Sequence, residues 1–327
     1  MDAYRNAILE NRVRFKDKVV LDVGTGSGVL AIWAAMAGAK RVYAVEATTM
    51  AKNARRLARA NGFQEVIIVL EGYMEQLSLP EQVDIILSEW MGYFLLRESM
   101  LDSVIASRVK YLKPGGALYP SHAQLHMAPL CTQLYHARHA EYVEELAHWQ
   151  TFGQYMRSTN SIEIDVLDET WRQEQFEYLM QTSHWCQLSP EEVIGESFTC
   201  LTLDVHDCTV DQVSSFRSNF RSRILAAAEL TALGGWFDVQ FCGSEQEPAA
   251  VDVELTTAPP SDTHWGQQVF FVSPPQHLLP GDVLEGHVAM TRQRANHRLL
   301  WLQITFTITR PSVGEIYPER TLNFRID

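Results

Sequence analysis

The 327-residue sequence contains few cysteines, and none is arranged to form a cross-link. The five cysteines are odd in number, widely scattered and without a CxxC pair: Cys131, Cys186, Cys200, Cys208 and Cys242. This pattern argues against both a disulfide framework and a structural zinc site, and no metal ligand is predicted. It is typical of a protein that works in a reducing compartment.

Long apolar runs are also missing. The longest, VLAIWAAMAGA at residues 29–39, is too short and too rich in small side chains to span a bilayer. Residues 1–18 are charged and lack the apolar core of a signal peptide. We therefore expect a soluble protein of intracellular type with no membrane partner. Since no strong basic targeting run is present, the cytoplasm and the nucleus are both open as locations.

Basic charge is scarce: 27 Lys and Arg residues stand against 40 Asp and Glu residues, for a net charge of −13. Because phosphate binding needs a basic face, we expect no direct nucleic-acid partner. An acidic surface could instead steer basic peptides to a site, although solubility alone explains most of these charges. With 46% apolar residues, the chain can bury roughly three-quarters of its unfolded surface, in about two domains.

The first third of the sequence alternates strand and helix patterns. Apolar strand patterns at 18–24, 41–46, 65–72 and 83–89 alternate with helix patterns at 29–39, 48–62 and 99–112. The rhythm predicts an α/β domain, with an open parallel sheet and right-handed crossovers, over residues 1–120.

The pattern changes beyond this domain. Residues 131–190 hold many helix formers and repeated aromatics, and from residue 197 onward apolar and polar residues alternate between turn residues. Such alternation is typical of an antiparallel sheet or barrel. Residues 121–327 are therefore predicted to form an antiparallel β-barrel domain, with a helical insertion at about 131–190.

A glycine-rich loop joins the first predicted strand to the first predicted helix. In LDVGTGSGVL the glycines are Gly24, Gly26 and Gly28. Such a turn lets backbone approach a ligand at the carboxyl edge of the sheet, although a purely structural turn would use the same residues. Glu46 ends the next strand, where a carboxylate can accept both hydroxyls of a ribose.

Residues beside this loop indicate which nucleotide would bind. The dinucleotide fingerprint needs glycine at position 29, where this chain has Val29, so an NAD-dependent dehydrogenase is disfavoured. Asp22 would repel a phosphate but could bind the amino group of an amino-acid tail. S-adenosylmethionine meets these requirements. Glu75 lies where its adenine edge would be, although this residue alone is equally well a surface acid.

Two acids bracket an apolar segment after the fourth strand. In SEWMGYFLLRESM, residues 88–100, these acids are Glu89 and Glu98. Two carboxylates aimed at one point need solvent or a shared cation. Guanidinium is planar, always charged and matched to bidentate contact, so the pair favours an arginine substrate. Each acid alone is more simply solvated, or, for Glu98, part of a first helical turn.

Three motifs in this order are specific to one enzyme family. They are VVLDVGTGSGVLAIWAAMAGAKRVYAVEA, then SEWMGYFLLRESM with Met91 and Met100, then DTHWGQQVF at 262–270. Over essentially its whole length, the chain resembles the protein arginine methyltransferases, specifically the type I branch. The fold implied is a class I, Rossmann-like methyltransferase domain followed by a β-barrel.

The resemblance implies transfer of methyl from S-adenosylmethionine to protein arginine, giving monomethylarginine, asymmetric dimethylarginine and S-adenosylhomocysteine. Glu89 and Glu98 would grip the guanidinium, and His264 would help to carry a proton away. The implied cofactor site is Asp22, Gly24, Gly26, Gly28, Glu46, Met74 and Glu75. The implied substrate pocket is Trp90, Met91, Met100 and Trp265. Substrates would be basic, arginine- and glycine-rich segments, as in histones and RNA-binding proteins.

The resemblance also implies an assembly and a lid. The segment 131–190 corresponds to the family's dimerisation arm, whose Trp149, Phe152 and Tyr155 could dock onto a partner or close the arm's own core. We expect a head-to-tail homodimer. Family members carry lid helices upstream of the point that corresponds to Met1. We expect these helices to be trimmed or missing here, which would leave the cofactor pocket more open.

Two alternatives remain at this stage. The first is a class I methyltransferase that acts on a small molecule, which the glutamate pair and the Thr-His-Trp loop disfavour. The second is a catalytically incomplete dimeric scaffold or regulatory subunit of the same fold, which only the missing lid favours.

Overall fold

The computed structural model describes all residues, 1–327, and the chain forms two compact units. The first unit contains Met1–Leu125, Leu201–Ser214 and Phe237–Thr256. The second contains His126–Cys200, Ser215–Trp236 and Thr257–Asp327. The chain passes between the units along the strands β6 (His122–Leu130), β8 (Phe198–Asp204) and β10 (Ala228–Gly243).

A parallel sheet forms the centre of the first unit. Its strands are β1 (Val19–Val23), β2 (Arg41–Glu46), β3 (Ile67–Glu71), β4 (Val83–Leu87) and β5 (Leu112–Tyr119). They pair in the order β3-β2-β1-β4-β5, and each pair is parallel. β1 is buried along its whole length, as expected for a continuous apolar strand covered on both faces. The predicted α/β domain is confirmed.

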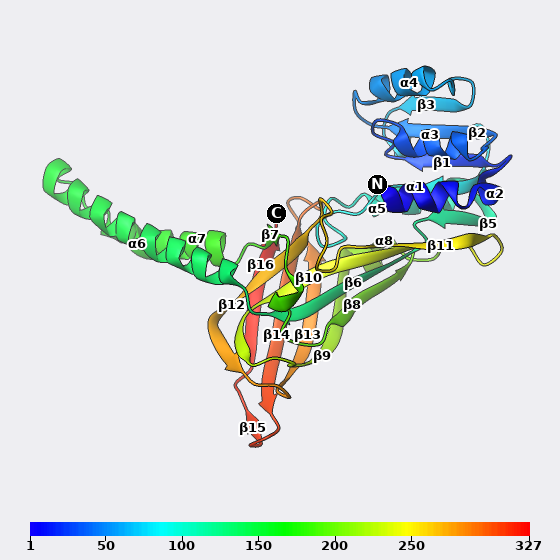
Figure 1. Cartoon of the computed structure of the whole chain (residues 1–327). Coiled ribbons are helices and arrows are strands. Elements are labelled where there is room, and N and C mark those ends of the chain that lie inside the picture. The colour runs from blue at the N-terminus through cyan, green and yellow to red at the C-terminus, as the bar shows by residue number, and fades with distance from the viewer. The chain divides into compact units, whose positions relative to one another are not determined.

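Helices border this sheet (Figure 1). The helical elements of the first unit are α1 (Asp2–Leu9), α2 (Arg12–Phe15), α3 (Val29–Met36), α4 (Ala51–Ala60), the 3-10 turn η1 (Met74–Gln76), α5 (Leu101–Tyr111) and α8 (Val210–Ser214). In α4 the alanines Ala51, Ala54 and Ala58 recur at helical spacing and are buried, while its arginines are exposed. A further strand, β11 (Pro248–Thr256), pairs antiparallel with β10.

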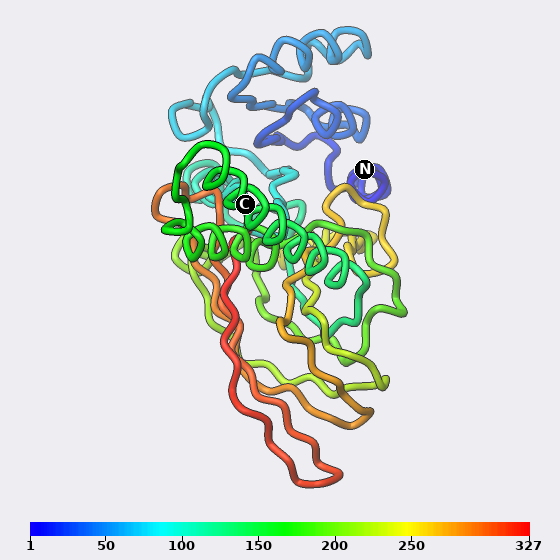
Figure 2. The backbone as a smooth tube through the Cα atoms, turned by 90° about the vertical axis from the view of Figure 1, so that its left-hand side faces the viewer, coloured from blue at the N-terminus to red at the C-terminus, as the bar shows by residue number.

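The second unit is mainly an antiparallel β structure. One sheet has the order β7-β12-β10-β6-β8, with β7 (His184–Cys186) and β12 (Gln267–Leu278). The other has the order β15-β14-β13-β9, with β16 beside β14. Its strands are β9 (Ser215–Arg223), β13 (Val283–Arg292), β14 (Leu300–Arg310), β15 (Glu315–Ile316) and β16 (Arg320–Ile326). Figure 2 shows β14 and β16 (red) running side by side to the turn that joins them.

Two helices project from this second unit (Figure 1). α6 (Gln133–Asn160) is capped by Thr132, whose side chain accepts the Leu134 N–H, and α7 (Asp168–Met180) packs along it. Trp149 and Trp171 stack between them, with ring centroids 4.8 Å apart. The predicted helical insertion is confirmed. No helix of the chain is both long and apolar enough to cross a membrane.

Candidate active site

The glycine loop connects β1 to α3 in a backbone conformation that side chains disfavour. Gly24, Gly26 and Gly28 have φ angles of 72°, 55° and 90°. A Cβ at Gly24 would lie 2.5 Å from the Cε of Met100, whereas a Cβ at Gly26 would meet nothing within 4 Å. At Gly24 the glycine loop is therefore packed against Met100, at the end of the 88–100 segment that carries Glu89 and Glu98. At Gly26 it is open to a ligand.

Two acids flank this loop, as the sequence predicts. Asp22 is fully buried; the Thr25 hydroxyl donates to its Oδ2 at 2.5 Å, and its Oδ1 has no partner. Burial raises the pKa of Asp22 to about 7, against the opposing effect of the Thr25 hydrogen bond. Glu46 accepts the Gly26 N–H at 2.9 Å on one oxygen and the Thr48 N–H and hydroxyl, at 2.9 and 2.6 Å, on the other. Glu46 thus also shapes the loop.

Met74 and Glu75 lie in η1, after β3. Met74 is buried, whereas Glu75 is exposed and accepts a hydrogen bond from the Ser103 hydroxyl at 2.6 Å. Ser103 belongs to α5, so this bond ties η1 to the helix that follows the glutamate segment. Contact of Glu75 with an adenine stays a prediction.

The glutamate loop, defined as residues 88–99, has a strained backbone. Four residues other than glycine have positive φ: Phe94 at 51°, Leu95 at 65°, Glu98 at 82° and Ser99 at 58°. Such backbone costs energy and persists only where surrounding contacts determine it. One of those contacts is the Gly92 N–H, which donates to the Leu95 carbonyl at 2.9 Å and closes the loop.

The two glutamates of this loop differ in their surroundings. Burial raises the pKa of Glu89 to about 7; the Met91 N–H opposes this shift, and the charge of Glu98 adds to it. The Oε1 of Glu89 is buried without a partner. Glu98 is exposed and pairs with Arg97 at 3.2 Å. The loop thus carries the largely desolvated carboxyl group of Glu89 and the solvated carboxylate of Glu98, whose charge raises the pKa of Glu89 further.

The predicted pocket residues of the first unit line the same segment. Trp90 and Met91 are buried, and the indole Nε1 of Trp90 has no partner. Met100 is partly buried against Gly24. One sheet edge therefore gathers the glycine loop, its acids and the glutamate loop.

The Thr-His-Trp loop belongs to the second unit. Trp265 is buried, and its ring lies 4.0 Å from the exposed His264 ring, centroid to centroid. The Trp185 Nε1 donates to the His264 carbonyl at 3.2 Å. Partial burial lowers the pKa of His264. The prediction that His264 and Trp265 join the glutamates concerns two units and stays a prediction.

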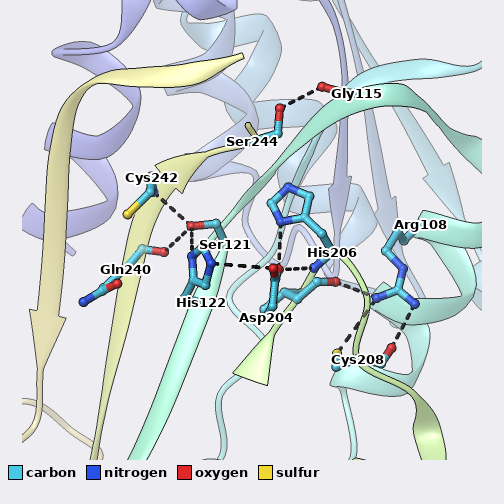
Figure 3. Close-up of polar contacts among 11 residues, drawn as sticks. Arg108, Gly115, Ser121, His122, Asp204, His206, Cys208, Gln240, Cys242 and Ser244 are labelled. Carbon is cyan, nitrogen blue, oxygen red and sulfur yellow. Dashed lines mark hydrogen bonds and ion pairs between the residues drawn. The ribbon is translucent and has the colours of Figure 1, made fainter. Parts of the chain in front are cut away.

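A second polar cluster of the first unit was not among the predicted residues (Figure 3). Ser121 lies 2.9 Å from His122 Nδ1, and His122 Nε2 lies 3.7 Å from Asp204. This row is not a nucleophilic triad, because Ser121 is fully buried and its hydroxyl donates to Gln240 O and accepts the Cys242 N–H. The cluster links the ends of β6, β8 and β10.

Comparisons with known proteins identify the class and then the family. A parallel sheet with a glycine loop after β1 and acids at the carboxyl ends of β1 and β2 is a nucleoside-binding domain of Rossmann type. Residues 7–121 match the model for ribosomal protein L11 methyltransferase (PrmA), and residues 122–311 match the arginine methyltransferase oligomerization subdomain. The chain belongs to the protein arginine N-methyltransferase family.

Individual relatives agree with this. The chain is 45% identical to protein arginine N-methyltransferase PRMT10 of Arabidopsis thaliana, over 95% of this chain and 82% of that protein. It is 45% identical to PRMT10 of Oryza sativa subsp. japonica, over 100% and 87%. A crystal structure of Arabidopsis thaliana protein arginine methyltransferase 10, described as uniquely open, matches with a TM-score of 0.97 and 42% identity, over 100% and 94% of the two chains.

A more distant structure supports the same family. The Trypanosoma brucei PRMT1 enzyme-prozyme heterotetrameric complex with AdoHcy matches at a TM-score of 0.81 and 28% identity, over 100% and 94% of the chains. The predicted family, fold class and cofactor, S-adenosylmethionine, are confirmed. The predicted division at residues 120 and 121, next to the junction of the two family models, stays a prediction.

Proposed function

We propose that this chain is a type I enzyme, which methylates arginine in basic, arginine- and glycine-rich protein segments to monomethylarginine and asymmetric dimethylarginine. The observation that carries the proposal is the pair Glu89 and Glu98, one desolvated and one solvated, in a single strained loop. The type I product is supported by the resemblance at Met91 and Met100, whose thioethers lie in or beside that loop.

The residues around the glycine loop fit the cofactor. Asp22 offers a buried, unpartnered carboxylate oxygen to an ammonium group. The backbone at Gly26 has open space beside it. The Glu46 Oε2 accepts the Gly26 N–H and keeps lone-pair capacity for a ribose hydroxyl, whereas Oε1 already accepts two hydrogen bonds from Thr48. Met74 and Glu75 would border the adenine. When bound, the cofactor supplies an electrophilic methyl group on a sulfonium.

The glutamates would hold the substrate guanidinium from two sides. An opposite charge within a few ångströms favours the ionised form of a carboxyl group, so a guanidinium would lower the pKa of Glu89 from its raised value. Both carboxylates, Glu89 and Glu98, then offset the repulsion between guanidinium and sulfonium. They also concentrate electron density on the attacking nitrogen. Most of the catalysis would be positioning and electrostatics.

Methylation replaces a guanidinium N–H bond by an N–CH3 bond and releases one proton. We assign His264 to help carry that proton away, since its imidazole is exposed and its lowered pKa favours the neutral form, which can accept. Trp265, buried beside it, would form a wall of the substrate pocket.

The arm formed by α6 and α7 would make a homodimer. Phe152 and Tyr155 remain exposed on α6, and residues 122–311 match a subdomain described by oligomerization. The related Trypanosoma brucei enzyme forms a heterotetramer with its prozyme. We place the enzyme in the cytoplasm, the nucleus or both, with no direct nucleic-acid or membrane partner.

The test is mass spectrometry of an Arg-Gly-Gly-repeat peptide after incubation with this chain and S-adenosylmethionine. We expect mono- and asymmetric dimethylarginine with the parent chain and neither product with Glu98→Gln. The matched control is Glu71→Gln, an exposed acid that ends β3 and pairs with Arg55, which should retain parent activity. A parent chain that binds the cofactor but leaves the peptide unmodified would support the scaffold alternative.

A further inference from the structure

Tyr4 reaches from α1 to the start of the glutamate loop. Its side chain is 1% exposed, and its hydroxyl donates to the Ser88 carbonyl at 2.9 Å and lies 3.4 Å from the Sδ of Met91. In the sequence, Ser88 precedes Glu89 directly and Met91 follows it by two residues. Burial first, and then the charges of Glu89 and Asp22, raise the pKa of Tyr4 well above its usual value, so the hydroxyl keeps its proton.

The helix that carries Tyr4 is itself fixed. Asn11, just beyond α1, is fully buried and uses both atoms of its amide. Its Nδ2 donates to the carbonyls of Ala7 and Val251 at 3.0 and 2.8 Å, and its Oδ1 accepts the N–H groups of Ala250 and Val251 at 2.6 and 2.8 Å. The Tyr4 ring meets the edge of Phe241 at 4.8 Å and 76°. Tyr4 is thus held through its backbone by the fixed helix α1 and along its ring by Phe241.

The glutamate loop needs such an external support. Its residues 94, 95, 98 and 99 adopt positive φ, and Glu89 carries a desolvated carboxyl group at its start. A loop under strain moves when one contact is lost, and a displacement of about 1 Å at a reacting group can cost roughly 10²-fold in rate.

We propose that Tyr4 is a positioning residue for methyl transfer: by fixing Ser88 and Met91, it directs the Glu89 carboxylate toward the substrate guanidinium. This inference rests on the proposed function. Nothing in the sequence pattern singles out Tyr4 beyond its place on the apolar face of α1, with Ala7 and Ile8.

The test is Tyr4→Phe, which keeps the packed ring and removes only the hydroxyl. We expect kcat to fall about ten- to a hundredfold, while KM for S-adenosylmethionine changes less than about twofold because the glycine loop is untouched. Affinity for an Arg-Gly-Gly peptide in the presence of S-adenosylhomocysteine should weaken as well. That binding readout requires the loop but no turnover.

The matched control is Tyr43→Phe. Tyr43 is also buried, at 2% exposure, and its hydroxyl donates to Glu81 at 2.9 Å, before β4 and at the opposite end of that strand from Glu89. We expect its kcat and peptide affinity to stay within about twofold of the parent. In the Glu89→Gln background, Tyr4→Phe should add little further loss of peptide affinity, because residues that act as a unit are not additive.

The outcomes separate this inference from the proposed function. An active parent chain with an equally active Tyr4→Phe variant would overturn the role of Tyr4 alone. Loss of S-adenosylhomocysteine binding and of cooperative unfolding in Tyr4→Phe would also overturn it, because the hydroxyl would then be needed for the fold. A parent chain that neither binds nor methylates the peptide would overturn the proposed function and this inference with it.

Discussion

At the scale of single residues, Glu89 and Glu98 have the same side chain but opposite environments. Glu98 is exposed and paired with Arg97, while burial raises the pKa of Glu89 to about 7. Asp22 shows the same burial-driven shift, to about 7. Two carboxyl groups that resist ionisation thus lie at one sheet edge. Burial of these groups lowers stability above pH 7, and in the proposed function each of them faces a cation.

Replacing Glu89 tests this trade-off. The folded pKa of about 7 exceeds the usual 4.5, so the folded state holds this proton more tightly than the unfolded chain. The resulting stability is full below the usual pKa and is lost as pH rises through about 7. At pH values above 7, Glu89→Gln should therefore raise the free energy of unfolding by on the order of 1–3 kcal/mol, and the thermal unfolding midpoint with it. The same substitution should abolish methylation.

Thermal unfolding at several pH values, beside peptide methylation, provides the measurement. Glu98→Gln is the control: it should abolish methylation without the gain in stability, because Glu98 is solvated. In the parent chain, kcat/KM for the peptide should rise with pH through about 7. An unfolding midpoint of Glu89→Gln that follows the parent at every pH would contradict the argument.

At the scale of secondary-structure elements, the sequence predicts what local pattern determines. Continuous apolar runs predict β1 to β4 because strands buried on both faces need them. The same reasoning predicts a helix at residues 99–112 and no further strand in this domain, whereas β5 begins at Leu112. Long-range contacts fix this strand: it pairs with β4, and Lys113 bonds Asp84 at 2.7 Å. Such contacts leave no local signal.

The candidate site divides in the same way. The glycine loop, Glu46 and the glutamate pair are predictable because functional side chains follow strand ends. The positive φ angles of residues 94, 95, 98 and 99, the Tyr4 hydrogen bond and the His122–Asp204 link are not, because each depends on the three-dimensional packing of distant segments.

At this same scale, the arm formed by α6 and α7 leads to a prediction about dimerisation. Phe152 and Tyr155 are 47% and 55% exposed on α6, whereas Trp149 is stacked inside the arm on Trp171. Removing both exposed rings by Phe152→Ser with Tyr155→Ser should convert a dimer to a monomer in sedimentation velocity, since large aromatics dominate interface energies. The control is Val109→Ser on α5, which is 77% exposed and should stay dimeric. A double variant that sediments like the parent would rule out these rings as the contact.

At the scale of the whole molecule, the net charge of −13 opposes the positive charge of the proposed substrates. Long-range electrostatic attraction between the acidic protein and a basic peptide increases the rate at which they meet. This attraction weakens with salt, because the screening length falls from roughly 30 Å at 0.01 M to about 3 Å at 1 M. We therefore expect kcat/KM for an Arg-Gly-Gly-repeat peptide to fall about tenfold over that range. The change should lie mainly in KM, because the Glu89 carboxyl group that would hold the guanidinium is largely withdrawn from solvent.

A peptide with one arginine between glycines should show a weaker salt dependence, since it carries less charge outside the site. Equal salt dependence for the two peptides would mean that the acidic surface serves solubility alone and that recognition is confined to the glutamate loop.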